Sequence, residues 1–207
     1  MQEKEAHGEV ETHHPGFLFA QATYYVGYIK GIGKIYQQTG IDTFSIVGSA
    51  KLYLDKTQTV AADFLNSKAL PFFDDHGTSI LRVLTDNGRE YCGVPDTHHY
   101  QLFMYLNDIE HSRTKARHPQ TNGAVEKFKQ IIQDEFYNVP FRKKLDTNLD
   151  DLQGDLDEYM KKYNCDRTNQ GKRCKGKTPC ETFSEGVELY KKMVYDFQEQ
   201  DEEVVLH

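Results

Sequence analysis

The chain has 207 residues, of which 38% are hydrophobic and 12% aromatic, and this composition suits one globular domain with short tails. No stretch approaches the roughly 18 consecutive apolar residues of a membrane helix, and the first residues lack a signal-peptide pattern, so we expect a cytoplasmic protein without a membrane partner. The formal net charge of −7 at first argues against nucleic acid as a partner, because phosphate contacts come from Lys and Arg.

The negative charge is concentrated at the two ends of the chain. Residues 1–15 carry four acids and one lysine, and residues 186–207 carry six acids and two lysines, so residues 16–185 hold 22 bases and 22 acids. We therefore divide the chain into a flexible leader (1–15), a core domain (16–185) and an acidic C-terminal tail (186–207). The neutral core leaves room for local basic surfaces that could follow a DNA backbone.

Five segments of the core have the composition of strands. We expect strands at Phe17–Ile29, Lys34–Asp42, Ser49–Leu54, Ile80–Leu84 and Ile109–Ser112. The first three are joined by short turns and predict an antiparallel meander. The last two are separated from their neighbours by helical segments, which predicts parallel pairing. The expected architecture is α/β, with a mixed five-stranded sheet flanked by helices.

Apolar residues at helical spacing predict the remaining elements. A helix starts at Thr57 and is either kinked at Pro71 or followed there by a second segment. Asp96 is expected to cap a helix that ends near Asn107, with Leu102 and Leu106 facing the sheet. Two more helices are expected at Gly123–Tyr137 and Leu149–Tyr163.

Two acids stand in contexts that suit a divalent-metal site. Asp86 follows the buried strand and precedes Asn87-Gly88, so the strand delivers a carboxylate to a turn. Glu126 stands near the start of a helix, after a polar loop. Carboxylates on rigid elements are the ligands that Mg²⁺ or Mn²⁺ prefers. Taken singly, Asp86 could be a turn former and Glu126 a residue that favours a helix N-terminus.

These motifs resemble the catalytic core of retroviral-type integrases and of bacterial insertion-sequence transposases, which use an acidic triad on a ribonuclease H-like fold. The resemblance extends over about residues 16–185. The matching residues are Thr85-Asp86-Asn87-Gly88, Pro119-Gln120-Thr121-Asn122-Gly123 before Glu126, Ile41-Asp42-Thr43-Phe44-Ser45, Tyr163-Asn164-Cys165-Asp166-Arg167 and Thr178-Pro179-Cys180-Glu181-Thr182-Phe183. The resemblance implies Mg²⁺- or Mn²⁺-dependent attack of a 3′-hydroxyl or water on a DNA phosphodiester, with Asp86 and Glu126 as catalytic metal ligands, and a homo-oligomer that brings two DNA ends together.

The first acid of that triad is missing from this chain. The first-strand segment that aligns with the family reads Phe19-Ala20-Gln21-Ala22-Thr23, and Ala22 stands where the first carboxylate is expected. A methyl group cannot bind a cation, so metal binding is expected to be weakened or absent and strand transfer impaired. Asp42 also ends an apolar strand and is the candidate substitute, although a strand-end aspartate more often bonds local backbone.

A basic stretch around the second motif is the expected DNA-binding surface. Between His111 and Gln130 five bases accompany the single acid Glu126. The predicted DNA contacts are Arg113, Lys115, Arg117, Gln120, Thr121, Asn122, Lys127 and Lys129. An ordinary solvated surface and helix-entry loop is the alternative interpretation.

Three functions remain open at this stage. The first is an integration or transposition core with impaired strand transfer, and the second is a non-catalytic DNA-binding or assembly module with the same fold. The third is a ribonuclease H-like hydrolase of RNA–DNA hybrids, against which the Pro119–Gly123 loop argues. The four cysteines lack zinc-site spacing, so we expect them to be reduced and structural.

Overall fold

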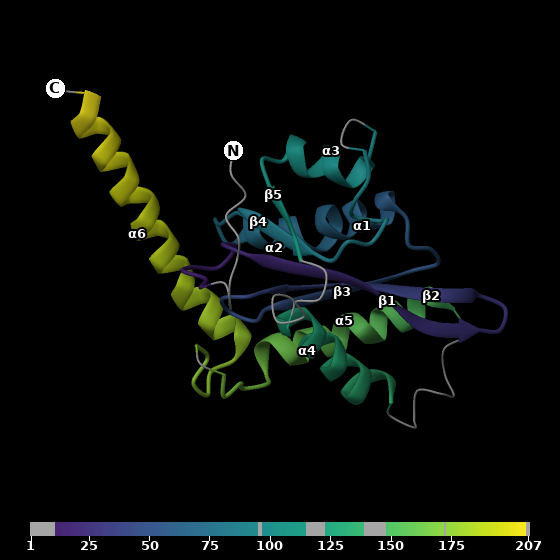
Figure 1. Cartoon of the computed structure of the whole chain (residues 1–207). Coiled ribbons are helices and arrows are strands. Elements are labelled where there is room, and N and C mark those ends of the chain that lie inside the picture. Colours follow the sequence, from purple (N-terminus) through teal and green to yellow (C-terminus); the bar gives the residue numbers. More distant parts are fainter. Residues whose placement is uncertain (1–10, 95–96, 115–122, 139–147, 172, 206–207) are drawn as a thin grey trace.

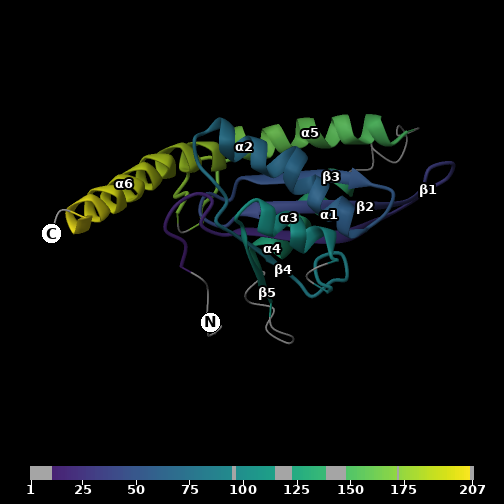
Figure 2. The ribbon, with the colours of Figure 1, turned by 90° about the horizontal axis from the view of Figure 1, so that it is seen from above.

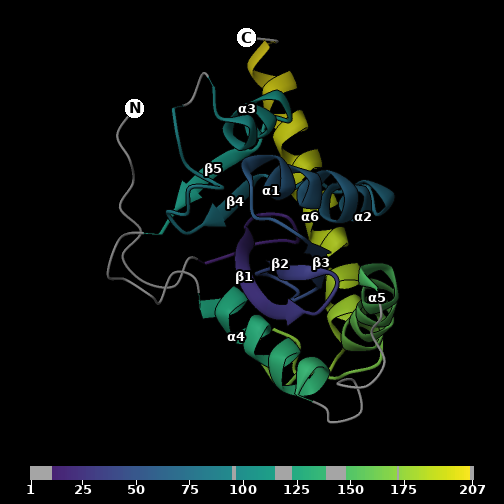
Figure 3. The same ribbon diagram turned by 90° about the vertical axis from the view of Figure 1, so that its right-hand side faces the viewer.

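The computed structural model describes residues 11–94, 97–114, 123–138, 148–171 and 173–205. A five-stranded sheet lies between two layers of helices, and its strand order is β3-β2-β1-β4-β5 (Figures 1 and 3). Strands β1 (Phe19–Ile29), β2 (Gly33–Asp42) and β3 (Gly48–Tyr53) pair antiparallel. Strands β4 (Arg82–Thr85) and β5 (Glu110–Arg113) are added in parallel. The predicted fold class and strand arrangement are therefore confirmed.

The central strand β1 sends alternate side chains to the two faces of the sheet. Phe19 belongs to a core with the helices between β3 and β5, whereas Ala20 and Ala22 belong to a second core on the opposite face. Val125 and Phe128 from the helix that follows β5 pack in this second core. A one-residue change of register would exchange the two sets of side chains, so the alternation fixes which residues of β1 can meet that helix.

The first face is covered by α1 (Gln58–Phe64), α2 (Leu70–Asp75) and α3 (His99–Leu106). A π-helical segment over Leu65–Ala69 joins α1 to α2 just before Pro71. Proline has no N–H to donate and displaces the carbonyl one turn earlier, so a helix commonly widens or bends before it. Of the two alternatives predicted at Pro71, the structure shows a second helical segment, α2.

The orientation predicted for α3 was wrong. Leu102 and Leu106 are 44% and 70% exposed, whereas Tyr100 and Met104 are buried in the first core. The helix begins at His99, after His98, and the expected cap at Asp96 lies outside the described residues. The sequence pattern did not indicate Tyr100 as a core residue, because a buried tyrosine hydroxyl needs a hydrogen-bond acceptor. Gln21 supplies that acceptor, and its side-chain oxygen accepts from the Tyr100 hydroxyl at 2.8 Å.

The second face is covered by α4 (Gly123–Ile132) and α5 (Leu149–Cys165). Helix α4 continues into a π-helical segment, Gln133–Tyr137, so the helical span expected here is confirmed to its predicted end. The buried residues of the two helices repeat at three- to four-residue spacing, as a helix on a sheet requires. They are Val125, Phe128, Ile132, Leu152, Leu156, Met160 and Tyr163.

Two amide side chains of α5 bond to the outer side of β3. Asn164 accepts from the Gly48 N–H at 2.9 Å and donates to the Gly48 carbonyl at 2.9 Å. Gln153 accepts from the Leu52 N–H at 2.7 Å and donates to the Ala50 carbonyl at 3.5 Å. These groups point away from β2 and would otherwise lack a partner from the sheet. Asn164 of the Tyr163–Arg167 motif therefore has a structural role.

The last described helix, α6 (Pro179–Val205), extends away from the rest of the molecule (Figures 1 and 2). Thr178 and Glu181 form a reciprocal cap at its start: the Thr178 N–H donates to the Glu181 carboxylate at 2.8 Å, and the Glu181 N–H donates to Thr178 Oγ1 at 3.2 Å. Pro179 occupies the first helical position, where its lack of an N–H costs nothing. The boundary predicted between residues 185 and 186 falls inside this helix.

The structure differs in part from the expectations for the N-terminal leader and for the cysteines. Part of the predicted leader is packed, since His14 is buried and its ring lies 5.0 Å from that of Tyr190 in α6. Residues 1–10 lie outside the described part of the chain.

Cys165 and Cys180 form a disulfide between the end of α5 and the start of α6, so the expectation that all cysteines are reduced was wrong for this pair. The spacing of the cysteines in the sequence does not indicate this pairing.

Candidate metal and DNA site

Asp86 stands one residue beyond the end of β4 and is exposed. Its Oδ1 accepts a hydrogen bond from the Gly88 N–H at 2.7 Å, which closes a tight turn after the strand. Asn87 fixes the same turn to the neighbouring segment by donating to the Thr114 carbonyl at 2.8 Å. The turn-forming role considered for Asp86 is thus present, and it uses only one carboxylate oxygen.

The strand register brings Asp86 toward Ala22. Phe19 pairs with Val83 and Ala20 with Leu84 in the parallel ladder between β1 and β4. If the same register continued for two more residues, it would set Ala22 beside Asp86, although the ladder itself ends at Ala20 and Leu84. Because side chains alternate along a strand, Asp86 then has the orientation of Leu84 and Ala22, toward the face that α4 covers.

Ala22 itself offers no ligand. It is 5% exposed and packs in the second core, which includes Val125 and Phe128. Its partner in β2 is Thr39, which is fully buried. The position predicted for the first acid is therefore an apolar one within a packed core.

Glu126 lies on α4, directly after the buried Val125, and its side chain is exposed. Lys129 links it to the sheet: Lys129 Nζ is 3.5 Å from Glu126 Oε2 and 5.4 Å from the centre of the Tyr24 ring. Tyr24 is two residues from Ala22 on β1, so it belongs to the same face. Glu126 therefore reaches the neighbourhood of Ala22 through one intervening lysine.

The donor set can be compared with the needs of a cation. Among the described residues, no group of three or more His, Cys, Asp or Glu side chains is arranged to hold a metal ion. Mg²⁺ commonly uses one or two protein carboxylates and completes its shell with water and phosphate oxygens. Asp86 and Glu126 are donors of the kind that one such ion uses, and their joint binding of an ion stays a prediction. A two-ion site would need a bridging carboxylate, which Ala22 cannot supply.

Asp42, the candidate substitute, is engaged elsewhere. It pairs with Phe19, three residues along β1 from Ala22, and it is fully buried. Its carboxylate accepts from the Gly16 N–H at 2.9 Å, the Ser45 N–H at 2.8 Å and the Ser45 hydroxyl at 2.5 Å. Burial raises the pKa of this carboxyl, and the bonds from Ser45 and Gly16 oppose that rise. The structure does not bring Asp42 to Asp86.

Replacing Asp42 with alanine is expected to destabilise the fold. The Gly16 and Ser45 N–H groups would be left buried without acceptors, and we expect a loss of about 3 kcal/mol in the free energy of unfolding. Urea unfolding followed by circular dichroism measures it. The matched control is Asp75→Ala at an exposed position, which should change the same quantity by less than about 0.5 kcal/mol. Equal effects of the two substitutions would show that the Asp42 hydrogen bonds contribute little.

Buried polar side chains beneath β1 were missed by sequence reasoning. Gln21 donates to Gln38 at 3.0 Å, and Gln38 donates to Thr23 at 2.8 Å. The Tyr91 hydroxyl donates to Gln38 at 3.1 Å and lies 2.7 Å from Thr23 Oγ1. Burial raises the Tyr91 pKa well above its ordinary range, so the phenol is neutral. This network ties the loop after β4 to the strand that carries Ala22.

The predicted DNA-binding residues are only partly described. Arg113, at the end of β5, and Lys127, on α4, are exposed, and Lys129 makes the contacts already given. The other five, Lys115, Arg117, Gln120, Thr121 and Asn122, lie outside the described residues. Next to Arg113, His111 has its pKa lowered to about 4 by burial and by the nearby Arg113 and His98. His111 is therefore neutral near pH 7 and adds no charge for phosphate.

Comparison with known proteins finds similarity to integrases. Residues 107–179 match the family model "Integrase core domain". A curated relative, "Putative integrase ORF3" of Spiroplasma virus SpV1-C74, is 30% identical over 178 residues, which is 81% of this chain and 48% of the relative. The chain thus spans about half the length of that relative.

Solved integrase structures share the fold. A chain of the simian T-cell lymphotropic virus intasome, solved with PP2A regulatory subunit B56 gamma, has a TM-score of 0.66 at 20% identity and covers 88% of this chain and 59% of its own. The HTLV-2 integrase catalytic core in complex with magnesium has a TM-score of 0.57 at 20% identity. The match covers 82% of this chain and 97% of the HTLV-2 chain. The BIV integrase catalytic core has a TM-score of 0.60 at 17% identity. The match covers 87% of this chain and 99% of the BIV chain.

No described helix has the length and apolar content to cross a membrane. Residues 107–179, which include β5, Glu126 and the whole of α5, match an integrase core domain within a chain whose fold is that of the retroviral integrase catalytic cores.

Proposed function

We propose that the chain is a DNA integration or transposition core whose chemistry is metal-dependent phosphodiester strand transfer, and that this activity is impaired because Ala22 replaces the first catalytic acid. The observation that carries the proposal is the parallel pairing of Phe19 with Val83 and of Ala20 with Leu84, which directs the end of β4, and with it Asp86, toward the part of β1 that holds Ala22. The integrase core match over residues 107–179 supports it independently, because that segment contains Glu126.

In this proposal Asp86 and Glu126 are the catalytic residues, and they bind one Mg²⁺ or Mn²⁺. The bound cation supplies positive charge that stabilises the phosphodiester oxygens as the attacking and leaving oxygens exchange. Asp86 offers the oxygen that the turn leaves free, and Lys129 holds the Glu126 carboxylate near β1. Both acids are on exposed surface, so a DNA strand can reach them.

Loss of the first acid should affect turnover more than binding. Two ions normally share the first-strand carboxylate, and one ion alone cannot stabilise both the attacking and the leaving oxygen. The packing of Ala22 in an apolar cluster gives a second ion no oxygen at that position. We therefore expect weak or absent binding of a second cation and little strand transfer by the chain as it stands.

A non-catalytic DNA-binding or assembly module is the second candidate. Ala22 favours this candidate, because the chain keeps the integrase fold and the predicted basic surface but lacks a carboxylate at the position predicted for the first metal ligand. In either case the partner is DNA, with Arg113 and Lys127 among the described contacts and residues 115–122 between them in sequence. The HTLV-2 core has been solved in dimeric and trimeric forms, which supports a homo-oligomer for this chain as well.

DNA binding can be tested by fluorescence anisotropy with a labelled duplex. We expect the affinity to fall at least about tenfold between 50 and 200 mM salt, because phosphate contacts release counterions. Substituting both Arg113→Gln and Lys127→Gln should make the slope of log affinity against log salt shallower by about 2. Lys192→Gln, an exposed lysine on α6, is the matched control and should leave the slope unchanged. Failure of the intact chain to bind at 50 mM salt would rule out both candidates.

A further inference from the structure

The hairpin formed by β1 and β2 is longer than the sheet that carries it. The ladder of β1 with β4 stops at Ala20, and the ladder of β2 with β3 stops where Tyr36 pairs with Tyr53. Beyond Tyr25 and Tyr36 the hairpin is therefore a two-stranded ribbon, and its tip lies at the end of the molecule opposite α6 (Figures 1 and 2). A two-stranded ribbon is only marginally stable in water by itself, so this extension needs support.

One face of the ribbon is apolar and supplies that support. Ile35 of β2 is fully buried in the second core, on the side of the sheet that α4 covers. The partly buried side chains that pack against the same core are Val26, Ile29 and Ile32. Because side chains alternate along a strand, Lys34 and Tyr36, the neighbours of Ile35, belong to the opposite face. The ribbon is thus held to the molecule through one of its two faces.

The opposite face of the ribbon is aromatic and exposed. Tyr25 pairs with Tyr36 and Tyr28 pairs with Lys34, and directly paired residues share a face. Tyr25 is 52% exposed and Tyr28 is 67% exposed, and the centre of the Tyr25 ring lies 5.6 Å from that of Tyr36. A Cβ built on Gly31, at the tip, would meet no atom of the described residues within 4 Å. The tyrosine rings are therefore open to a partner.

The ribbon carries positive charge without an acid. Residues 12–41 contain no Asp or Glu, whereas Lys30 lies at the tip and Lys34 lies opposite Tyr28. Both lysines are exposed, and the ion pairs formed among the described residues include neither of them. A surface with cations and no anion attracts a polyanion. The same charge disfavours a second copy of the chain as the partner, because two such faces repel each other.

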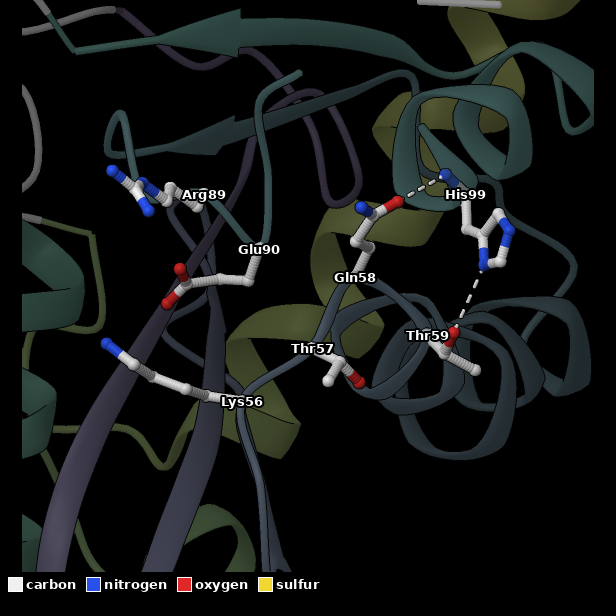
Figure 4. A pocket seen from close by; sticks show the side chains of 7 residues that line it. All are labelled: Lys56, Thr57, Gln58, Thr59, Arg89, Glu90 and His99. Atoms are coloured by element: carbon white, nitrogen blue, oxygen red, sulfur yellow. Dashed lines mark hydrogen bonds between the residues drawn. The ribbon is translucent and has the colours of Figure 1, made fainter. Parts of the chain in front are cut away.

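The same side of the sheet carries two further cations near the β4 loop. Tyr25 points to the same side of β1 as Phe19, which belongs to the core covered by α1 and α3. On that side Lys56 and Arg89 line a cavity of about 360 Å³ together with residues of α1 and α3. Figure 4 shows Lys56 and Arg89 on either side of the Glu90 carboxylate, which offsets part of their charge. The acid-free ribbon is therefore the better binding surface for an anionic strand.

We propose that the exposed face of this ribbon binds DNA whose bases are unpaired. Tyr25 and Tyr28 stack on the bases. Lys30 and Lys34 contact the phosphates between those bases. An aromatic ring can stack on any base, but the flat faces of the bases are accessible only where the strand is unpaired. The inference rests on the proposed function, because it takes DNA as the partner, and it adds a contact surface to the one predicted around Lys127.

Fluorescence anisotropy of labelled oligothymidine measures the contribution of the two tyrosines. We expect Tyr25→Ala and Tyr28→Ala each to weaken binding by the whole chain at least about fivefold, because each removes one stacking platform. Binding of a blunt duplex should change less than about twofold, because its bases already stack on one another. Tyr105→Ala, at a tyrosine of α3 that is 78% exposed, is the matched control and should leave both affinities unchanged.

The salt dependence of the same binding measures the contribution of the two lysines. Substituting both Lys30→Gln and Lys34→Gln should make the slope of log affinity against log salt shallower by about 1.4, because each phosphate contact to a single strand contributes about 0.7. Lys192→Gln on α6 is the matched control and should leave this slope unchanged. An unchanged slope in the double variant would remove the lysines from the proposed surface.

A tryptophan reporter tests the stacking directly. The chain contains no Trp, so Tyr28→Trp introduces a single one. We expect oligothymidine to quench its emission while the affinity stays within about twofold of that of the unmodified chain, because an indole ring also stacks on bases. Tyr105→Trp is the matched control and should show no quenching. An affected affinity without quenching in Tyr28→Trp would contradict stacking at this position.

The outcomes separate this inference from the proposed function. Duplex binding by the unmodified chain, with oligothymidine affinity unchanged in both tyrosine-to-alanine variants, overturns the inference and leaves the proposed function in place. Equal losses for duplex and oligothymidine overturn the assignment to unpaired bases. Absence of binding to either DNA overturns the proposed function as well. A smaller sedimentation coefficient of Tyr28→Ala without DNA would assign the face to a second copy of the chain and overturn the inference. Circular dichroism confirms that each variant is folded.

Discussion

Substituting Ala22 with aspartate is expected to raise the rate of Mn²⁺- or Mg²⁺-dependent strand transfer at least about 100-fold over that of the unmodified chain. The reason is that a pair of bound metal ions lowers the activation free energy by several kcal/mol. The new carboxylate would stand beside Asp86, in line with the register of β1 and β4, and could bridge two ions. Gel analysis of a labelled oligonucleotide incubated with target DNA measures the joined product. Gel analysis of the cleavage of a labelled RNA–DNA hybrid tests the hydrolase alternative.

The matched control is Ala22→Asn, which has nearly the same volume and no charge. Ala22 is 5% exposed in an apolar cluster, so both substitutions should lower stability, but only aspartate should regain it when Mn²⁺ is added. Activity in the unmodified chain equal to that of Ala22→Asp would show that another residue already replaces the first acid. No activity in either protein, together with salt-dependent DNA binding, would favour the non-catalytic module.

Substituting Gly48 with alanine is expected to lower the free energy of unfolding by about 3 kcal/mol, the upper part of the range for overpacked cores. The added Cβ would stand 2.2 Å from Cζ of Phe128, and two further ring atoms lie within 2.7 Å. Phe128 is 1% exposed and packs against Tyr163 with ring centres 4.9 Å apart, so the ring cannot move without displacing α4. Urea unfolding at pH 7 measures the change.

Gly154→Ala is the internal control for this prediction. Gly154 lies in the middle of α5, and a Cβ there meets nothing within 4 Å, so the same chemical change should stabilise the protein by about 0.5–1 kcal/mol. Opposite signs at the two glycines are expected. A Gly48→Ala protein as stable as the unmodified chain would mean that α4 moves freely over the sheet, and the position of Glu126 would then lose its rigid support.

Strand pattern and motif spacing were sufficient to predict the sheet and the placement of Asp86. The meander, the late parallel strands and the position of Asp86 directly after a buried strand all follow from period-two alternation and short turns. That Ala22 stands in place of a first acid stays a prediction from the first-strand motif. Whether Asp86, Glu126 and a cation act together stays a prediction.

Other features depend on tertiary partners that a local pattern does not contain. The register of α3 was predicted wrongly because two leucines appeared better suited to the core than Tyr100, whose buried acceptor, Gln21, is 79 residues away. Asp42 appeared free to bind a metal because its donors, Gly16 and Ser45, become neighbours only in the folded chain.

The amide side chains of α5 also bear on how copies of this chain can associate. Strand β3 is an end strand of the sheet, and an end strand with unpaired backbone groups can recruit a strand from another molecule. Asn164 and Gln153 occupy those groups at Gly48, Ala50 and Leu52. Continuous sheets across subunits are therefore blocked at this border, and any homo-oligomer that assembles on DNA must form through other surfaces of the molecule.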